Sequence, residues 1–164
     1  IQPERNKIQV DEKSVALSPG MVVSVEIKTG SRRVIEYFLN PLMQYANERK
    51  QFGKPIIKFQ VNAFKLADMA LKIELARNLL YKSCWLKDAG KAYGKESAMA
   101  KLYCSEIARE VADEALQIHG GYGYLADYGI EKIVRDLRVH QILEGTNEIM
   151  RVIISRTLLA ERDR

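Results

Sequence analysis

The segment with the clearest chemical potential is Glu144-Gly145-Thr146, which lies just before a predicted helix. A carboxylate on a tight turn can reach over a flat cofactor as a general base, and a neighbouring glycine lets a ligand approach the backbone. Thr146 is a natural N-cap, and the free N–H groups at the start of the helix could bind an anionic ligand. The alternative is a solvated carboxylate near the positive end of the helix dipole.

A second stretch, residues 117–121 (Gln-Ile-His-Gly-Gly), predicts a helix end followed by glycines. Glycines allow left-handed turns and a close approach of phosphate or ribose to the backbone. An ordinary glycine C-cap is the alternative. Neither His119 nor His140 has partners at the spacing of metal ligands, so no metal site is predicted.

Arg49 opens the third stretch, residues 49–53 (Arg-Lys-Gln-Phe-Gly). Its guanidinium is a surface cation by default, although its forked geometry suits a phosphate. Two other features are expected to be structural. Cys84 and Cys104 form no C-x-x-C pair and are expected to be reduced thiols of the core. The run Arg-Asp-Leu-Arg at 135–138 is expected to form ion pairs.

The elements that must position these residues are mostly helical. Apolar residues at helical spacing predict helices over residues 59–89, 94–118, about 128–136 and about 147–160. The first of these carries two apolar stripes, which predicts burial on two sides inside a bundle. Upstream, Ser31 is expected to cap a helix from about 32 to 42 that Pro41 kinks or ends, and a second helical piece is predicted over 45–52.

Residues 1–30 have a different pattern, which predicts strands at 8–10 and 21–27. The fold class is therefore predicted to be mainly α, an antiparallel helical bundle with a short N-terminal β-hairpin. We expect two parts, residues 1–42 and residues 43–164.

Size and composition limit the function classes. The chain has 164 residues, of which 47% are hydrophobic, enough for one cored domain with an appendage. The net charge of +5 is spread without a run of Lys or Arg, so a nucleic-acid partner is not expected. No apolar stretch reaches the length of a membrane span.

Together, the three stretches resemble the C-terminal helical domain of acyl-CoA dehydrogenases over residues 43–161. The matching motifs are RKQFG at 49–53, QIHGGYGY at 117–124 and QILEGTNEIMR at 141–151. That family removes two hydrogens from an acyl-CoA thioester and transfers them to FAD. With Ile-Ser-Arg at 154–156, the last motif looks most similar to branched-chain members, of the isobutyryl-CoA type in particular.

The resemblance implies a role for each matched residue. Glu144 would be the base that takes the α-proton of the thioester, and Gly145 would contact the substrate. Arg49 and residues 117–121 would reach the FAD of a neighbouring subunit, so a homo-oligomer is expected. The implied FAD contacts are Arg49, Gln51, Phe52, Gln60, Gln117, Ile118, His119, Gly120, Gly121, Thr146, Asn147 and Glu148.

Residues 1–42 resemble something else, the C-terminal end of the periplasmic adaptor (membrane-fusion) proteins of type I secretion. The matching elements are SPGM at 18–21, IKTG at 27–30 and LNPL at 39–42. The chain is therefore expected to be a fusion of two fragments that join near 42–45.

The implied function is FAD-dependent α,β-dehydrogenation of an acyl-CoA, with little or no activity expected of this short chain alone. Its rivals are a non-catalytic helical scaffold or assembly fragment and a piece of a secretion adaptor. The adaptor reading requires a long coiled coil and a lipoyl-like region, and the sequence has neither. Since no secretory signal is recognised, a cytoplasmic location is expected, or the mitochondrial matrix in a eukaryote.

Overall fold

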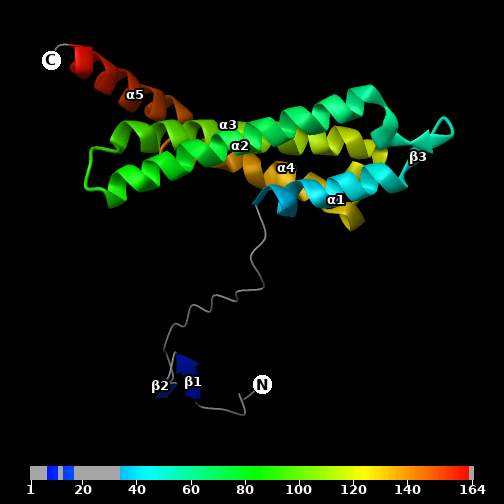
Figure 1. Cartoon of the computed structure of the whole chain (residues 1–164), viewed down its shortest axis with the longest axis horizontal. Helices are drawn as coiled ribbons and strands as arrows, with labels where there is room; N and C mark the ends of the chain where they lie inside the picture. Colours follow the sequence, from blue (N-terminus) through cyan, green and yellow to red (C-terminus); the bar gives the residue numbers. More distant parts are fainter. Residues whose placement is uncertain (1–6, 11–12, 17–33, 163–164) are drawn as a thin grey trace. The chain divides into compact units, whose positions relative to one another are not determined.

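The computed structural model describes residues 7–10, 13–16 and 34–162 (Figure 1). The chain divides into the units Ile1–Ser31 and Arg32–Arg164. In the first unit, β1 (Lys7–Val10) pairs antiparallel with β2 (Lys13–Ala16), with Ile8 opposite Val15. The strand predicted at 8–10 is confirmed, whereas the strand predicted at 21–27 and the cap at Ser31 lie outside the described residues.

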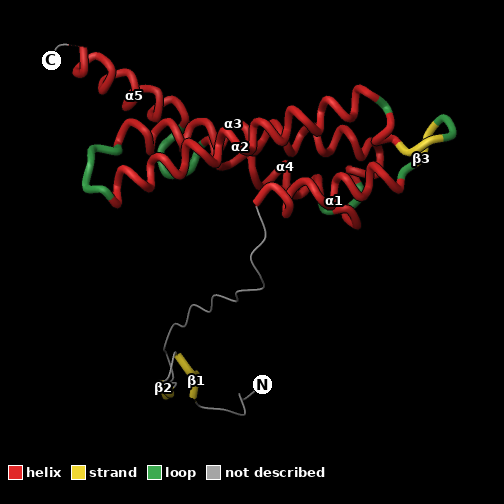
Figure 2. Tube along the Cα trace, viewed as in Figure 1, coloured by secondary structure: helices red, strands yellow, loops and turns green. Residues whose placement is uncertain are grey.

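The second unit is almost wholly helical (Figure 2), which confirms the predicted fold class. Its α-helices are α1 (Val34–Glu48), α2 (Gln60–Asp88), α3 (Gly94–His119), α4 (Ile130–Arg138) and α5 (Asn147–Arg162). Short 3₁₀ turns connect them: η1 (Ile56–Lys58), η2 (Gly120–Tyr124), η3 (Ala126–Tyr128) and η4 (Val139–Gln141). The four helices predicted beyond residue 58 are confirmed to within two residues at each end.

Helices α2 and α3 form the long axis of the bundle and run antiparallel. Ion pairs between them follow this direction, from Lys65–Glu114 (2.5 Å) at one end to Lys82–Glu96 (3.5 Å) at the other. In Figure 1, α5 lies at one end of this helix pair, and α1 and β3 lie toward the other. Different elements therefore pack at the two ends of the α2–α3 pair.

Helix α1 runs without a break through Pro41, so the predicted division into two pieces is wrong. A proline inside a helix destabilises it by about 3 kcal/mol. Here Leu39, Leu42 and Ala46, on both sides of the proline, are buried against α2 and α3. Burying each leucine contributes about 1.5–3 kcal/mol, which is enough to offset the proline.

The same helix ends at Glu48, four residues before the predicted end, because the chain turns into a small hairpin. Strand β3 (Lys50–Gln51) pairs with β4 (Lys54–Pro55), and Phe52 and Gly53 at the tip have φ of +50° and +79°. Two left-handed residues in succession form the type I′ turn that suits a two-residue hairpin loop.

The prediction that α2 is buried on two sides is wrong for this chain by itself. Met69 is buried and Leu66 and Ile73 pack against the core, but Phe64, Leu71 and Leu75 on the other stripe are 60%, 60% and 50% exposed. No described element covers that stripe, because α1, α3 and α4 all lie on the first side.

The cysteines also differ from each other. Burial raises the pKa of the Cys104 thiol, which lies 3.6 Å from the carbonyl oxygen of Ala76. Cys84 is exposed, so the prediction of two core thiols is wrong for this residue. Asp136, in the predicted ion-pair run, pairs with Lys132 one turn earlier on α4.

Candidate functional site

The structure gathers most of the predicted residues around Arg49 and the end of α3 into one cavity. This cavity, called the Arg49 pocket below, has a volume of about 500 Å³. Predicted residues that line it are Arg49, Gln51, Ile118, His119, Gly120 and Gly121; Tyr45, Ile56, Tyr122 and Leu125 complete the lining. About seventy residues of sequence separate its two halves, so only the tertiary fold brings them together.

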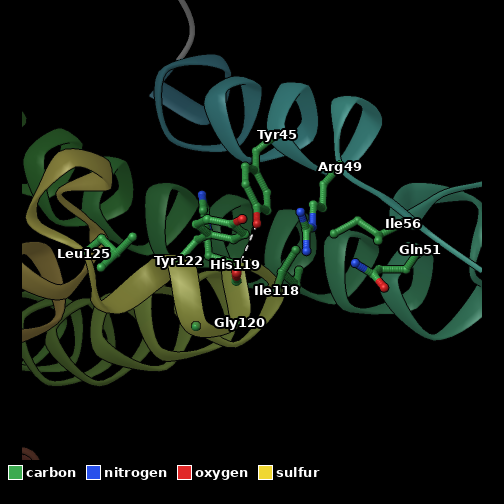
Figure 3. A pocket seen from close by; sticks show the side chains of 10 residues that line it. Tyr45, Arg49, Gln51, Ile56, Ile118, His119, Gly120, Tyr122 and Leu125 are labelled. Atoms are coloured by element: carbon green, nitrogen blue, oxygen red, sulfur yellow. Dashed lines mark hydrogen bonds between the residues drawn. The ribbon is translucent and has the colours of Figure 1, made fainter.

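Tyr45 on α1 and Arg49, the residue that follows α1, present their side chains to the pocket. Figure 3 shows both side chains pointing toward the end of α3. The Tyr45 hydroxyl donates to the carbonyl oxygen of His119 (3.0 Å), and the two rings stack with centroids 4.1 Å apart. The Arg49 guanidinium lies over the Tyr122 ring, 4.8 Å from its centroid. Burial raises the pKa of Tyr45, and the charge of Arg49 opposes this shift.

The floor of the pocket is the turn that ends α3. Gly120 has φ of +60°, as expected for the predicted glycine cap, and its N–H bonds to the carbonyl oxygens of Gln117 and Leu116. A Cβ placed on Gly120 or Gly121 would meet no atom within 4 Å. The packing of the fold therefore does not require a glycine at 121, a residue that lines the pocket.

Among the described residues that line the pocket, Arg49 is the only one with a permanent charge. His119 lies 2.7 Å from the carbonyl oxygen of Ala115 through Nδ1, so this nitrogen carries the proton in the neutral ring. Its other nitrogen is then an acceptor. A cation beside aromatic rings and open glycines suits an anionic group attached to a flat, polar ring system.

Six predicted contacts do not line this pocket, and three of them, Phe52, Gln60 and Gln117, lie near it in the sequence. Phe52, at the tip of the β3–β4 hairpin, is 93% exposed and meets Phe59 edge-on. Gln60 begins α2 and Gln117 lies on the last turn of α3, and both side chains are exposed. Conversely, sequence reasoning missed Tyr45 and Tyr122. Tyr45 lies four residues before Arg49, on the same face of a helix, which is a signal the sequence contains.

The second group of predicted residues forms the turn before α5. Glu144 is exposed and has φ of +53°, and Gly145 follows with φ of +95°. Thr146 caps α5, its hydroxyl oxygen lying 3.4 Å from the Ile149 nitrogen, as the sequence predicts. A cavity of about 170 Å³ beside this turn is lined by Thr146, Asn147 and Glu148 together with Glu106, Arg138, Gln141, Ile142 and Arg151.

Asn147 is the best-buried member of this turn, with 4% of its surface exposed. Its side-chain oxygen accepts a hydrogen bond from the Lys101 ammonium (2.8 Å) and lies 3.1 Å from the Ser105 hydroxyl. Its amide nitrogen is buried without a partner among the described residues. An unpaired buried N–H group is unfavourable, so an acceptor from outside the described chain would stabilise it.

The Arg49 pocket and the Glu144 turn lie far apart. Ser105 touches the turn and His119 touches the pocket, and both are on α3. At 1.5 Å per residue their separation is about 20 Å. The structure therefore does not bring all the predicted residues around a single point. Among the described residues, no group of three or more His, Cys, Asp or Glu side chains is placed to bind a metal.

Comparison with known proteins gives one family. The family described as "Acyl-CoA dehydrogenase, C-terminal domain" matches residues 26–159. The probable acyl-CoA dehydrogenase YngJ of Bacillus subtilis is 51% identical over 121 residues, 74% of this chain and 32% of YngJ. Butyryl-CoA dehydrogenase from Megasphaera elsdenii has a similar structure, with a TM-score of 0.73 at 45% identity over 76% of this chain and 33% of that one. The FAD complex of PigA has the same TM-score at 35% identity, over 76% and 32% of the two chains.

The extent of these matches bears on the N-terminal residues. A further Bacillus subtilis acyl-CoA dehydrogenase is 43% identical over 159 residues, 96% of this chain and 42% of that protein. The chain thus spans between 32% and 42% of the length of these relatives. Since the family match starts at residue 26, the predicted join near 42–45 falls inside the matched region. That join stays a prediction.

Proposed function

Because the chain belongs to the acyl-CoA dehydrogenase family, we propose that it supplies the C-terminal helical part of an FAD-dependent enzyme that oxidises an acyl-CoA thioester. The observation that carries the proposal is the Arg49 pocket, in which residues implied to contact FAD come together from the end of α3 and from the segment that follows α1, including β3. A helical scaffold without a ligand would not need glycines with open space above them, or a guanidinium over an aromatic ring, at the lining of this pocket.

In this proposal Glu144 is the catalytic base. Its carboxylate lies on an exposed turn, and Gly145 beside it has no side chain that would keep a thioester away. Glu144 would take the proton from the α-carbon. FAD, when bound, supplies the acceptor for the hydride that leaves the β-carbon.

Two features of the chain fit such a cofactor. The unpaired amide of Asn147 could donate to a polar atom of FAD near the turn. At the other end, Arg49 could bind the pyrophosphate, with the open space above Gly121 admitting it. Because these features are about 20 Å apart along α3, we propose that each serves a different FAD, one of them bound mainly by a neighbouring copy.

A homo-oligomer follows from this sharing, and the open stripe of α2 supports it. Phe64, Leu71 and Leu75 present an apolar surface that a monomer would leave in water. A second copy is our proposed cover. Sedimentation at increasing concentration should show association, and Leu71→Glu should abolish it.

Finer assignments remain proposals. The substrate class suggested by residues 141–156 is a branched-chain acyl-CoA. The adaptor-like origin of residues 1–42 and the cytoplasmic location also stay predictions. Among the described helices, none combines the length and the apolar character that a membrane span requires.

Titration of the purified chain with FAD, followed by flavin fluorescence, tests the proposal. Wild-type protein should bind saturably. Arg49→Ala should abolish binding, while Gln60→Ala, whose side chain lies outside the pocket, should weaken it less. Arg109→Ala is the matched control, since it removes an arginine from an exposed ion pair within α3. Absence of any saturable binding would favour the scaffold alternative.

Anaerobic mixing with FAD and an acyl-CoA tests the second part. We expect no turnover above that of the Glu144→Gln variant, because most of the FAD site belongs to other parts of such an enzyme. Turnover that depends on Glu144 would show that this chain suffices.

A further inference from the structure

Lys101 ties the turn that carries Glu144 to the middle of the bundle. From α3, its ammonium donates to the carbonyl oxygen of Gly145 (2.6 Å) and to the side-chain oxygen of Asn147 (2.8 Å). These two acceptors flank Thr146 and follow Glu144 directly. One side chain therefore holds both ends of the short segment that joins Glu144 to α5.

The backbone of residues 144 and 145 has a conformation that needs stabilising contacts. Glu144 is one of two described non-glycine residues with positive φ, the other being Phe52 in its hairpin. The left-handed region is unfavourable for a residue with a Cβ, because the Cβ comes too close to the following carbonyl oxygen. Gly145 has φ of +95°, so the turn contains two unusual conformations in succession. A charge-assisted hydrogen bond to the Gly145 carbonyl is of the strength required to keep that conformation.

Generic helix stability does not explain a lysine at this position. Lys101 reaches the N-terminal end of α5, where the helix dipole disfavours a positive charge. By contrast, the other lysine that joins α3 to α5, Lys95, pairs with Glu161 near the C-terminal end of α5, where the dipole favours a cation. The two oxygen acceptors, together with the nearby charge of Glu148, account for the placement of Lys101.

We infer that Lys101 is a positioning residue that fixes the left-handed turn of Glu144 and thereby aims its carboxylate at the substrate. Ser105, one turn further along α3, supports the same Asn147 oxygen (3.1 Å). The inference rests on the proposed role of Glu144 as base, but the effect of Lys101 on the turn can be measured without catalysis.

The test compares Lys101→Met with the wild type by NMR in the full chain. A residue with positive φ gives a strong cross-peak between its own amide and α protons, and this signature at Glu144 should disappear in Lys101→Met. Hydrogen exchange of the amides of residues 143–146 should accelerate about tenfold or more, as expected for the loss of a charge-assisted bond. Amides in the middle of α2 should not change.

Three further variants keep the test decisive. Lys95→Met removes the other lysine contact between the same helices and should leave the turn unchanged. Lys101→Arg keeps the charge and should restore the Glu144 signature.

If Lys101→Met does not fold, Asn147→Ala serves instead. It removes one acceptor but keeps the bond to Gly145, so it should loosen the turn less than tenfold. An unchanged turn in Lys101→Met, or in Asn147→Ala where that variant stands in for it, would overturn the inference.

A chemical readout separates this inference from the proposed function. In D₂O, the base should exchange the α-protons of butyryl-CoA, and Lys101→Met should lower the rate constant about tenfold with little change in the concentration dependence. Unaltered exchange in Lys101→Met, with a wild-type rate that depends on Glu144, would overturn the positioning role. If the wild type shows no exchange beyond Glu144→Gln, this chain alone does not act as the base, and the NMR comparison decides whether Lys101 holds the turn.

Discussion

The two ends of α3 carry sites of opposite construction. At its C-terminal end, the Arg49 pocket is assembled from three separate parts of the chain and is open, with an arginine whose guanidinium lies over an aromatic face. Near its other end, the Glu144 turn is one continuous stretch whose backbone and Asn147 side chain are bonded to Lys101. The first site depends on how helices pack, and the second depends on local conformation held by one contact.

Under the proposed function, this difference would separate binding from chemistry. A pocket built from packed helices offers a broad surface, which suits recognition of a large cofactor. A base must instead be held to within a fraction of an ångström, which a strained turn with a charged anchor can do. The predictions below test whether the two ends respond independently.

Met69→Ala should have the largest effect on stability. Met69 is 2% exposed and lies in the core beneath α1 and the end of α3. Truncating such a side chain lowers the free energy of unfolding by about 2–5 kcal/mol. Urea denaturation measures this loss. At concentrations where the chain is monomeric, Leu71→Ala, on the open stripe of the same helix, should stay within about 0.5 kcal/mol of wild type. Equal losses in both variants would mean that the open stripe is covered in solution.

Substitutions of two nearby glycines, Gly121 and Gly123, should distinguish effects on stability from effects on FAD binding at the Arg49 pocket. A Cβ on Gly123 would lie 3.0 Å from the Leu116 carbonyl oxygen and 3.1 Å from the His119 Cβ, so Gly123→Ala should destabilise the chain by about 1–3 kcal/mol. Gly121→Ala meets no atom of the chain and should preserve the melting temperature while weakening FAD binding. If Gly121→Ala binds FAD like the wild type, the cofactor does not enter above that turn.

At the other end, Thr146→Ala should cost about 1 kcal/mol of stability, because α5 loses its N-cap. The cap bond is long, 3.4 Å, so the loss should lie at or below this value. Thermal unfolding followed by circular dichroism gives the change, with Thr157→Ala on the same helix as control. FAD binding at the Arg49 pocket should not respond, and a parallel loss there would show that the two ends are coupled.

The smallest expected effects are those of pH, and they have opposite signs at the two ends. A hydrogen bond from its own backbone N–H, and then one from Thr146, lower the pKa of Glu148 below 4.5. Its contribution is therefore present above that unfolded value and is lost as pH falls through the lower folded pKa. Burial raises the pKa of Tyr45 above 10.0, so its contribution is present below that value and is lost as pH rises through the higher folded pKa.

NMR titration should thus show the change at the start of α5 at a pH below the ordinary range of a glutamate, and the change at the Arg49 pocket at a pH above the ordinary range of a tyrosine. Glu148→Gln should remove the former and Tyr45→Phe the latter. A Glu148 titration at or above 4.5, or a Tyr45 titration at or below 10.0, would contradict this assignment.

The sequence by itself determined the helices, their caps and the candidate residues. Apolar periodicity and punctuation by Gly and Thr act over one or two turns, so α2, α3 and α5 and the caps at Gly120 and Thr146 could be read directly. Residue types in a known order also indicated the family. All of these signals are local in the chain.

Only the tertiary structure decided the rest. Pro41 stays within α1 because Leu39 and Leu42 are buried in a core formed by residues distant in the sequence. The free energy gained by this burial cannot be predicted from the local sequence around the proline. The Arg49 pocket joins residues about seventy positions apart, and the Lys101 contact joins residues 44 apart. Such contacts depend on how helices pack, and this packing also left one stripe of α2 open where the pattern predicted burial.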